Sequence, residues 1–401
     1  WRQRWRIHLT LAATWILLAG LVLQNTNRGG SAGFGLGVGF GKYFATQFQA
    51  VVHYLRLVLW PRPLIIDYGV QWTTSVWTMV PYVLAVGVLA VATVVALVRR
   101  PALGFLGFVF FALLAPSSLV PVIRQTLAEH RMYLALAPVL VSIVLAMHRA
   151  LKRRIWLIAA VATLGFGGLT IQRNYDYRSS AAIWLDTVTK RPGNAAAHNN
   201  YGNILAQAGQ PAEAIEEYDA ALRIDPHYTD AYFNAGNALM KLKRIPEAIT
   251  HYEEALRLVP NDAAVLNELG VALAMAGRGP EAMKRYEEAL RIQPAFAKAH
   301  RNLGRLLATT DHLPEAISHL EQAMKIDPSV PEVHSELGMA LAMSERAGEA
   351  IAHFEESLRL NPNQPQVELD LAIALENAGR RADASAHYEA ARRMGLSMPG
   401  P

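Results

Sequence analysis

Outside its repeats, the sequence holds six side chains that could act on a substrate at a membrane edge. They are Asp67, Arg124, Glu129, His130, Arg131 and Tyr133. Arg124, His130 and Arg131 could hold a lipid-linked phosphate through charge-assisted hydrogen bonds, and Glu129 or Asp67 could orient a polar substrate. Ionisable residues at a bilayer edge are costly to desolvate and are therefore functional candidates. The residue types alone favour a structural alternative, in which Glu129 pairs with Arg131 and Tyr133 lies in an interfacial belt.

A second set of candidate residues recurs with a fixed spacing in the C-terminal half, and its chemistry suits a peptide or protein ligand. It comprises Asn199, Asn203, Phe233, Asn237, Asn267, Arg301 and Arg305. Arg301 and Arg305 are four residues apart, so both side chains point from one face of a helix. With the asparagines they could bind a carboxylate or an extended backbone. Solvated helix residues that bind nothing are the open alternative.

A repeat of 34 residues positions this second set. Its clearest marks are Pro192, Pro226, Pro260, Pro294, Pro328 and Pro362. In units that start at residues 195, 229, 263, 297, 331 and 365, the eighth position is Gly in five units and Ala372 in the sixth. The twentieth position is always Ala, and the twenty-fourth is aromatic except at Leu320. This pattern resembles the tetratricopeptide-repeat family over residues 195–398, which implies six two-helix units stacked into a superhelix.

Each repeated residue has a physical role in this interpretation. Small side chains at the eighth and twentieth positions let helix A and helix B of one unit approach closely. The aromatic side chain is expected to fill the gap to the next unit, and the proline ends helix B. Glu368 and Ala372 depart from the pattern, so the sixth unit is interpreted as a polar cap. The resemblance implies a concave face of A helices that binds a peptide or protein, and it implies no catalytic residue.

The composition divides the chain into two parts. Residues 1–172 are dominated by apolar runs, and the remainder is charged and rich in alanine. The chain has no cysteine, which excludes a disulfide or a thiolate–metal site. Its net charge of +5 reflects arginines beside the apolar runs, and no nucleic-acid-binding motif is present, so we expect no nucleic-acid partner. We find no metal-ligand cluster, and interpret His300, His319 and His353 as exposed polar residues on different helix faces.

Five apolar segments are expected to span a membrane: 7–23, 80–98, 103–120, 132–147 and 155–171. Basic residues precede the first segment, separate the second from the third and separate the fourth from the fifth, so these stretches are expected to be cytoplasmic. The repeats would then lie on the periplasmic side of a bacterial inner membrane, or on the luminal side in a eukaryote. Residues 43–60 are interpreted as a re-entrant or interfacial helix, with a sixth span as the alternative.

Residues 173–194 are expected to form a half-repeat connector helix. Ser179 and Ser180 can cap it, Trp184 takes the aromatic position and Pro192 ends it. The last span thus runs into the repeats without a long linker, and we expect the solenoid to be docked on the membrane domain. The fold class predicted for the chain is all-α: a multi-span membrane helix bundle followed by a tetratricopeptide-repeat superhelix.

Three stretches precede a span and the repeats: YLRLVLWPRPLIIDY at 54–68, SSLVPV at 117–122 and AEHRMYLALA at 128–137. In this order they resemble the C-terminal half of the transmembrane and tetratricopeptide-repeat protein O-mannosyltransferase-like family, of the GT-C type and bacterial form. The resemblance implies an enzyme that passes a sugar from a polyprenyl phosphate to an acceptor outside the cytoplasm. Glu129, His130, Arg131 and Tyr133 match its motif, which the resemblance places near the lipid phosphate.

The acidic pair of that enzyme class is absent from this sequence. The resemblance implies such a pair in the first external loop, as base and metal ligand, but residues 24–45 contain no Asp or Glu. We therefore assign no catalytic residue and no cofactor, and a divalent metal would belong to a full-length enzyme. Because the sequence begins with Trp1, we expect a fragment or a processed product. Two hypotheses follow: part of a glycosyltransferase whose solenoid presents the acceptor, or a non-catalytic membrane-anchored scaffold.

Overall fold

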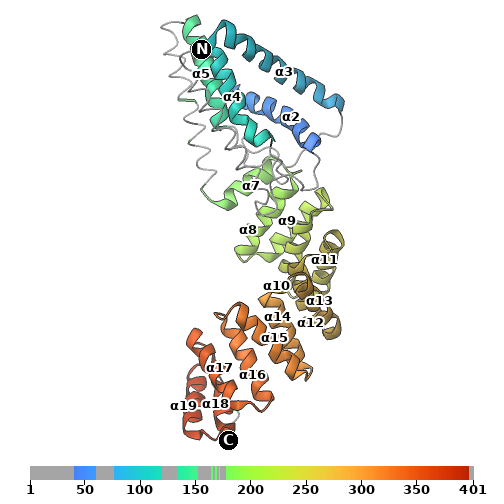
Figure 1. Ribbon diagram of the computed structural model, residues 1–401, viewed down its shortest axis with the longest axis vertical. Helices are drawn as coiled ribbons and strands as arrows, with labels where there is room; N and C mark the ends of the chain where they lie inside the picture. The colour runs from blue at the N-terminus through green and yellow to red at the C-terminus, as the bar shows by residue number, and fades with distance from the viewer. Residues whose placement is uncertain are drawn as a thin grey trace, which may run out of the picture. The chain divides into compact units, whose positions relative to one another are not determined.

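The computed structural model describes residues 40–59, 76–119, 133–151, 164–165, 168, 171 and 178–396. All regular secondary structure in this part of the chain is α-helical (Figure 1), which confirms the all-α class. The chain divides into two compact regions, Trp1–Pro226 and His227–Pro401, and each is described by itself.

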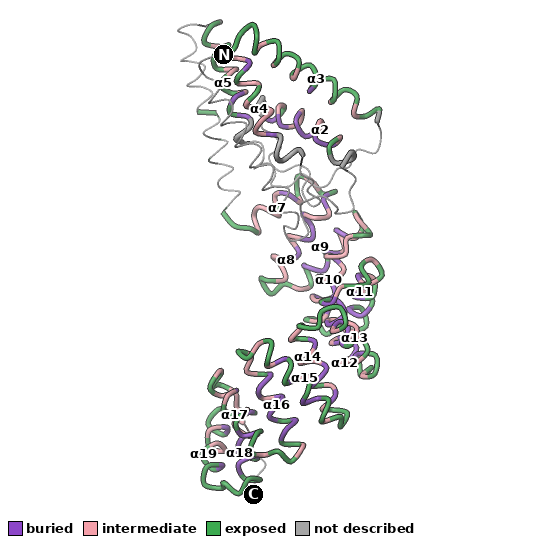
Figure 2. Tube along the Cα trace, viewed as in Figure 1, coloured by how far each residue is buried: buried purple, intermediate pink, exposed green. Residues whose placement is uncertain are grey.

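Four helices of the first region fall in the predicted membrane domain. They are α2 (Phe40–Leu59), α3 (Val76–Arg99), α4 (Pro101–Leu119) and α5 (Tyr133–Leu151). Helix α3 is long and apolar enough to cross a membrane. Most of its residues are exposed (Figure 2), and the large apolar residues among them include Val88, Val91 and Val98. A surface of this kind is unfavourable in water and suited to lipid.

The predicted multi-span bundle is supported at one span. Segment 80–98 lies within α3, which is long and apolar enough to span. Helices α4 and α5 contain the apolar stretches Pro101–Leu114 and Leu136–Arg149 among the residues whose side chains the structure describes. Segment 7–23 and most of 155–171 lie outside the described residues. Spanning of the membrane by these other four segments therefore stays a prediction.

Helix α2 covers the segment interpreted as re-entrant or interfacial, and it packs against the other three helices. The shared apolar cluster contains Ala50, Val51, Tyr54 and Leu57 of α2, Val86 of α3, Phe110 and Leu114 of α4, and Leu136 of α5. The α2 members follow helical spacing and so line one face. The depth of this helix in a bilayer stays a prediction.

The other helices described from residue 178 onward form a connector and six pairs, which we call units 1 to 6. The connector is α7 (Ser180–Lys190), and the Ser179 hydroxyl caps it by accepting a hydrogen bond from the Ala182 N–H at 3.1 Å. The pairs, with helix A first, are α8 (Ala195–Gln207) and α9 (Pro211–Ile224), α10 (Thr229–Lys241) and α11 (Ile245–Leu258), α12 (Ala263–Met275) and α13 (Gly279–Ile292), α14 (Ala297–Thr309) and α15 (Leu313–Ile326), α16 (Pro331–Met343) and α17 (Ala347–Leu360), and α18 (Pro365–Asn377) and α19 (Arg381–Arg393).

Local chemistry sets the ends of these helices. In units 1 to 4, helix B has one proline at its first or second position, where the missing N–H costs little. Asn194 and Asp262 cap helix A in units 1 and 3 through side-chain hydrogen bonds. The fifteenth position, in the turn between helices A and B, has a φ between 59° and 80° in all six units: Gly209, Lys243, Gly277, Asp311, Glu345 and Gly379. Glycine adopts this left-handed conformation at low cost, and other residues do not.

In the first five units a glycine packs against a large side chain of helix B. A Cβ added at Gly202, Gly236, Gly270, Gly304 or Gly338 would lie 2.5–2.8 Å from, respectively, Tyr218, Tyr252, Tyr286, Leu320 or Phe354. These five large side chains are fully buried. The twenty-fourth position thus packs against the glycine of its own unit. Leu320 and Phe354 also belong to one apolar cluster with residues of the following units, so the expectation that this position fills the gap to the next unit stays a prediction.

Unit 6 has a methyl group at this contact. Ala372 is fully buried, and Tyr388 at the twenty-fourth position is only half-buried. The Tyr388 hydroxyl donates to Glu376 at 2.9 Å and lies in an exposed position. Because a Cβ and a close-packed ring cannot share the same space, the alanine accounts for the more exposed ring.

Candidate functional site

The candidate site lies on one side of the A helices, which we call the helix-A face. It consists of the fifth, ninth and thirteenth positions of each unit, which are four residues apart and therefore share a helix face. The core of the same helices uses other positions: in α16 the buried apolar residues include Val333, Leu337 and Leu341. Side chains at the ninth and thirteenth positions of all six units are accordingly half-buried or exposed.

In units 1 and 2 the helix-A face presents asparagines whose orientation is fixed by a buried tyrosine. The Asn203 side-chain oxygen accepts from the Tyr218 hydroxyl at 2.8 Å, and that of Asn237 accepts from Tyr252 at 2.7 Å. Burial raises the pKa of Tyr218 to about 12 and also raises the pKa of Tyr252, so both hydroxyls remain protonated donors. The amide NH₂ groups of both asparagines keep their donors for another acceptor.

Asn199 and Phe233 occupy the fifth positions of the same units. Both contribute to the packing of helix A more than to its exposed surface. Asn199 is buried. The Phe233 ring is half-buried, with its centroid 6.0 Å from that of Tyr252 at a tilt of 50°. Phe233 therefore presents only part of its ring to a ligand.

Asn267 and Arg301, two further predicted ligands, bridge neighbouring units. Asn267 is 1% exposed and accepts a hydrogen bond from Asn302 at 2.9 Å. Arg301 donates two hydrogen bonds to Glu336, both of 2.9 Å. Each bridge joins the fifth position of one unit to the sixth position of the next, so both fix the register of the A helices. Asn267 is therefore closed to a ligand, whereas Arg301 keeps its Nη1 donors for one while the bridge is intact.

Arg305 differs from these residues because it is exposed and makes no hydrogen bond or ion pair within the described part of the chain. Around it the helix-A face is apolar. Met275 is 58% exposed, Met339 42%, Met343 56% and Ile373 44%. Sequence reasoning missed these four residues, although all occupy the ninth or thirteenth position and could have been found by extending the columns that contain Asn203 and Arg305.

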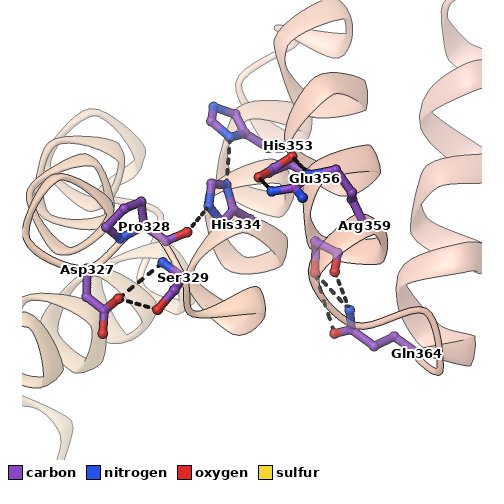
Figure 3. Close-up of polar contacts among 9 residues, drawn as sticks. Asp327, Pro328, Ser329, His334, His353, Glu356, Arg359 and Gln364 are labelled. Atoms are coloured by element: carbon purple, nitrogen blue, oxygen red, sulfur yellow. Dashed lines mark hydrogen bonds and ion pairs between the residues drawn. The ribbon is translucent and has the colours of Figure 1, made fainter.

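A second repeated contact joins helix A to helix B inside the units. It links the fourth and twenty-third positions, and its members are His198 with Glu217, His300 with His319, His334 with His353, and Glu368 with His387. The Nδ1–Nδ1 distances of the two histidine pairs are 2.9 Å for His300–His319 and 3.4 Å for His334–His353. Figure 3 shows His334 between His353 and the carbonyl of Pro328, to which its Nε2 donates at 3.1 Å.

The histidine pairs correct the interpretation of His300, His319 and His353 as scattered exposed residues. His300 also donates from Nε2 to a proline carbonyl, that of Pro294, at 3.0 Å. A neutral ring has one N–H, so His300 accepts at Nδ1 and His319 donates. The signal in the sequence is a spacing of 19 residues, which joins all four pairs.

The predicted membrane-edge residues cannot be placed in a site. Asp67, Arg124, Glu129, His130 and Arg131 lie outside the described residues, and Tyr133 is the first residue of α5. Among the residues that the structure describes, no three His, Asp or Glu side chains come together as a metal site.

Comparison with known proteins identifies the repeats. Models described as "Tetratricopeptide repeat" match residues 205–270 and 273–340, residues 172–229, and residues 331–364. The chain is 28% identical over 134 residues to human protein O-mannosyl-transferase TMTC1, an alignment that covers 31% of this chain and 15% of that protein. The chain thus spans about a seventh of the length of this relative.

Solved structures similar to the chain include two that cover half of it. One is YrrB, described as a TPR protein with an unusual peptide-binding site, at 22% identity and a TM-score of 0.40, covering 50% of this chain and 99% of that one. Another is pilF of Pseudomonas aeruginosa, at 21% identity and a TM-score of 0.47, covering 50% of this chain and 91% of that one. With the 34-residue period and the six helix pairs, the family matches identify the C-terminal half of this chain as a tetratricopeptide-repeat solenoid.

Proposed function

We propose that this chain is a membrane-anchored protein whose solenoid binds a protein or peptide on the helix-A face. The observation that carries the proposal is the exposed part of this face, because the ninth and thirteenth positions present side chains that the packing of the units does not require. Solenoids of this kind present extended surfaces to partners. In the second compact region, the amide of Asn237 and the cation of Arg305 supply polar contacts for such a partner. In the first region, Asn203 presents the same kind of amide.

Anchoring rests on α3 and on the distribution of basic residues. Helix α3 exposes its apolar side chains and is long enough to span a bilayer. Arg99 and Arg100 at its C-terminal end favour the cytoplasmic side for that end. With the predicted spans, this orientation puts the repeats on the periplasmic or luminal side, and the protein in the inner membrane if it is bacterial.

The absence of cysteine makes the orientation easy to measure. Ala378 lies at the exposed end of α18, so Ala378→Cys adds a single reactive thiol outside the core. In intact bacterial cells, or in sealed vesicles with the luminal side outward, a maleimide that cannot cross the membrane holding the protein should label this thiol. Labelling only after that membrane has been permeabilised would contradict the proposed orientation.

Partner binding is tested by comparing two faces of the same solenoid. A photoreactive amino acid in place of Ile373 lies on the helix-A face, and one in place of Arg291 lies on an exposed turn of helix B. Crosslinks to another polypeptide are expected from the first position and not from the second. Equal crosslinking from both positions, or crosslinking from the helix-B position alone, would contradict the assignment of the face.

The match to human TMTC1 favours a second, compatible function. In this proposal the chain is the C-terminal part of a GT-C-like glycosyltransferase that uses a polyprenyl-phosphate-linked sugar, and the solenoid presents the acceptor. A non-catalytic scaffold is the alternative. Arg124, His130 and Arg131 would hold the lipid phosphate, with Glu129, Tyr133 and Asp67 beside them. Sugar transfer by the full-length protein should fall in His130→Ala and Arg131→Ala, and transfer that survives both changes would remove this enzymatic role.

A further inference from the structure

The ninth-position column of the second compact region has a distinctive order of side chains. From unit 2 to unit 6 it holds Asn237, Val271, Arg305, Met339 and Ile373. The bridges Asn267–Asn302 and Arg301–Glu336 show that neighbouring A helices are aligned with an offset of 35 residues between the fifth and sixth positions. Equivalent positions of successive units therefore lie side by side along the stack.

This alignment puts one cation between two apolar patches. On one side of Arg305 are Val271 and the exposed Met275 of unit 3, and on the other are the exposed Met339, Met343 and Ile373. Neither the ninth nor the thirteenth column contains an acidic residue in these units. Arg305 has no internal counter-charge in its column, whereas the exposed Lys298 of the same helix has Glu332 at the same position of the next unit.

The chemistry of these side chains selects a ligand. A guanidinium pairs best with a carboxylate, which can accept two parallel hydrogen bonds. Methionine is flexible and polarizable, so exposed methionines adapt to apolar side chains of different shapes. A ligand that fits the column has a carboxylate in the middle and an apolar side chain toward each end.

The spacing can also be deduced. Packed helices lie about 8–10 Å apart. A segment in the polyproline II conformation advances about 3.1 Å per residue and has three residues per turn. Along the column it therefore passes from one unit to the next in about three residues, and side chains three residues apart point to the same side.

We propose that the helix-A face of units 3 to 6 binds a segment of a partner protein in the polyproline II conformation, with a carboxylate about three residues from an apolar side chain on either side. The carboxylate pairs with Arg305, and the apolar side chains lie on Met275 and on Met339 with Met343. This inference rests on the proposed function, because it names the chemistry of the partner bound by the same face.

The test uses the full chain in lipid nanodiscs and a short fluorescent peptide with blocked ends. The peptide has a central glutamate, leucines about three residues before and after it, and proline elsewhere to favour the polyproline II conformation. Binding is measured by fluorescence anisotropy. Arg305→Glu should weaken binding by about tenfold or more, and Met339→Ser with Met343→Ser should weaken it several-fold. Arg291→Glu, which changes an exposed arginine of helix B that is also without an ion-pair partner in the described residues, should leave it unchanged.

A double-mutant cycle identifies the contact. Replacing the central glutamate by glutamine should weaken binding to the parent chain and should make little difference to the R305E chain. Additive effects of the two changes, or an R305E chain that binds like the parent, would overturn the proposed pairing. Arg305→Gln serves as a second variant that removes the charge with a smaller change of surface.

Other occupants of the face give different results. Displacement of the peptide by phosphatidylcholine vesicles would indicate a lipid surface, and self-association that Met339→Ser with Met343→Ser abolishes would indicate a second copy of the chain. Either outcome overturns the peptide proposal. If crosslinks form from position 373 and no peptide binds, the chemistry of the partner is wrong and the proposed function stands. If position 373 forms no crosslink and no peptide binds, the proposed function and the proposed partner chemistry are both wrong.

Discussion

Units 4 and 5 have the same helix-pair architecture as units 1 and 6, but they differ from them in one polar contact between helix A and helix B. Units 1 and 6 join a histidine to a carboxylate, His198 to Glu217 and His387 to Glu368, with both distances 2.6 Å. Units 4 and 5 join two histidines at the same positions. The first kind of contact is compatible with a positive charge on the histidine, and the second places two positive charges together when both rings are protonated.

The same two groups of units differ in the turn between helices A and B. Units 1 and 6 have Gly209 and Gly379 at the left-handed position, and units 4 and 5 have Asp311 at φ 63° and Glu345 at φ 61°. A side chain in this conformation costs about 1 kcal/mol or more. We expect the turn to weaken units 4 and 5 at any pH and the histidine pairs to weaken them in acid, so that single columns would set the local stability of the repeat array without a change of fold.

The histidine pairs give units 4 and 5 a definite pH dependence. Burial lowers the pKa of His319, and neighbouring His300 lowers it further. Burial also lowers the pKa of His353, and His334 adds to this effect. The groups that oppose it are Glu321, Glu349 and Glu356. Because the unfolded chain then binds protons more readily, the contribution to stability is present above the ordinary pKa near 6.5 and is lost as the pH falls below it.

The largest expected effect concerns the packing that both groups of units share. A Cβ at Gly304 would lie 2.7 Å from Leu320 Cγ, so Gly304→Leu should separate helices α14 and α15 and cost about 1–3 kcal/mol. Hydrogen exchange of the peptides from unit 4 should rise at neutral and at acidic pH alike. Gly348→Leu is the control, since nothing lies within 4 Å of its added Cβ. A loss of protection confined to acid would show that charge, and not packing, limits this unit.

The next effect tests the histidine pairs directly. Between about pH 7.5 and about pH 5.5, on either side of the ordinary histidine pKa, hydrogen exchange of units 4 and 5 should rise after correction for the intrinsic rate. Exchange of units 1 and 6 should rise less. In the double variant H319E/H353E each pair becomes the histidine–carboxylate kind found in unit 1, and the rise should disappear.

The control for that experiment is His387→Gln, which removes a histidine paired with Glu368. It should leave the acid response of units 4 and 5 unchanged. If H319E/H353E opens these units in acid as the parent chain does, the two histidine contacts are not the cause of the pH dependence.

Much of the solenoid could be predicted because its determinants are local. The prolines near 34-residue intervals, the small residue at the eighth position and the large one at the twenty-fourth each act within one unit, and the helices follow them. The close contact of the aromatic column with the glycine of its own unit could not be predicted in this way. That Tyr252 packs on Gly236 depends on the angle between helices, which the spacing does not contain.

The helix-A face could be predicted only in part for a related reason. Periodicity gives the side of the helix, and thus the positions of Asn203 and Arg305. It does not show that Arg301 is held by Glu336 or that Asn267 is held by Asn302, since these bridges depend on the register between units. Of the predicted membrane spans, only the one in α3 is long and apolar enough within the described residues.

A smaller effect is expected when the carboxylate of unit 1 is removed. His198 Nδ1 lies 2.6 Å from a carboxylate oxygen of Glu217, and its Nε2 donates to the Pro192 carbonyl at 3.0 Å. Glu217→Gln removes the charged partner of this contact and should cost about 1–2 kcal/mol, with more hydrogen exchange in unit 1. Glu216→Gln is the exposed control. Equal exchange in both variants would mean that the ion pair does not distinguish unit 1.

The smallest effect concerns the turns of units 4 and 5. Asp311→Gly and Glu345→Gly should each raise stability by about 0.5–1 kcal/mol, because glycine relieves the left-handed strain and loses part of this gain to its own chain entropy. Hydrogen exchange of units 4 and 5 should slow at neutral and acidic pH alike. Ser344→Gly changes the neighbouring residue, whose φ is −90°, and should lower stability because no strain is relieved there. Since Asp tolerates the left-handed region better than Glu does, the gain should be larger at Glu345. A gain at Ser344 equal to that at Glu345 would show that backbone strain does not separate these units from units 1 and 6.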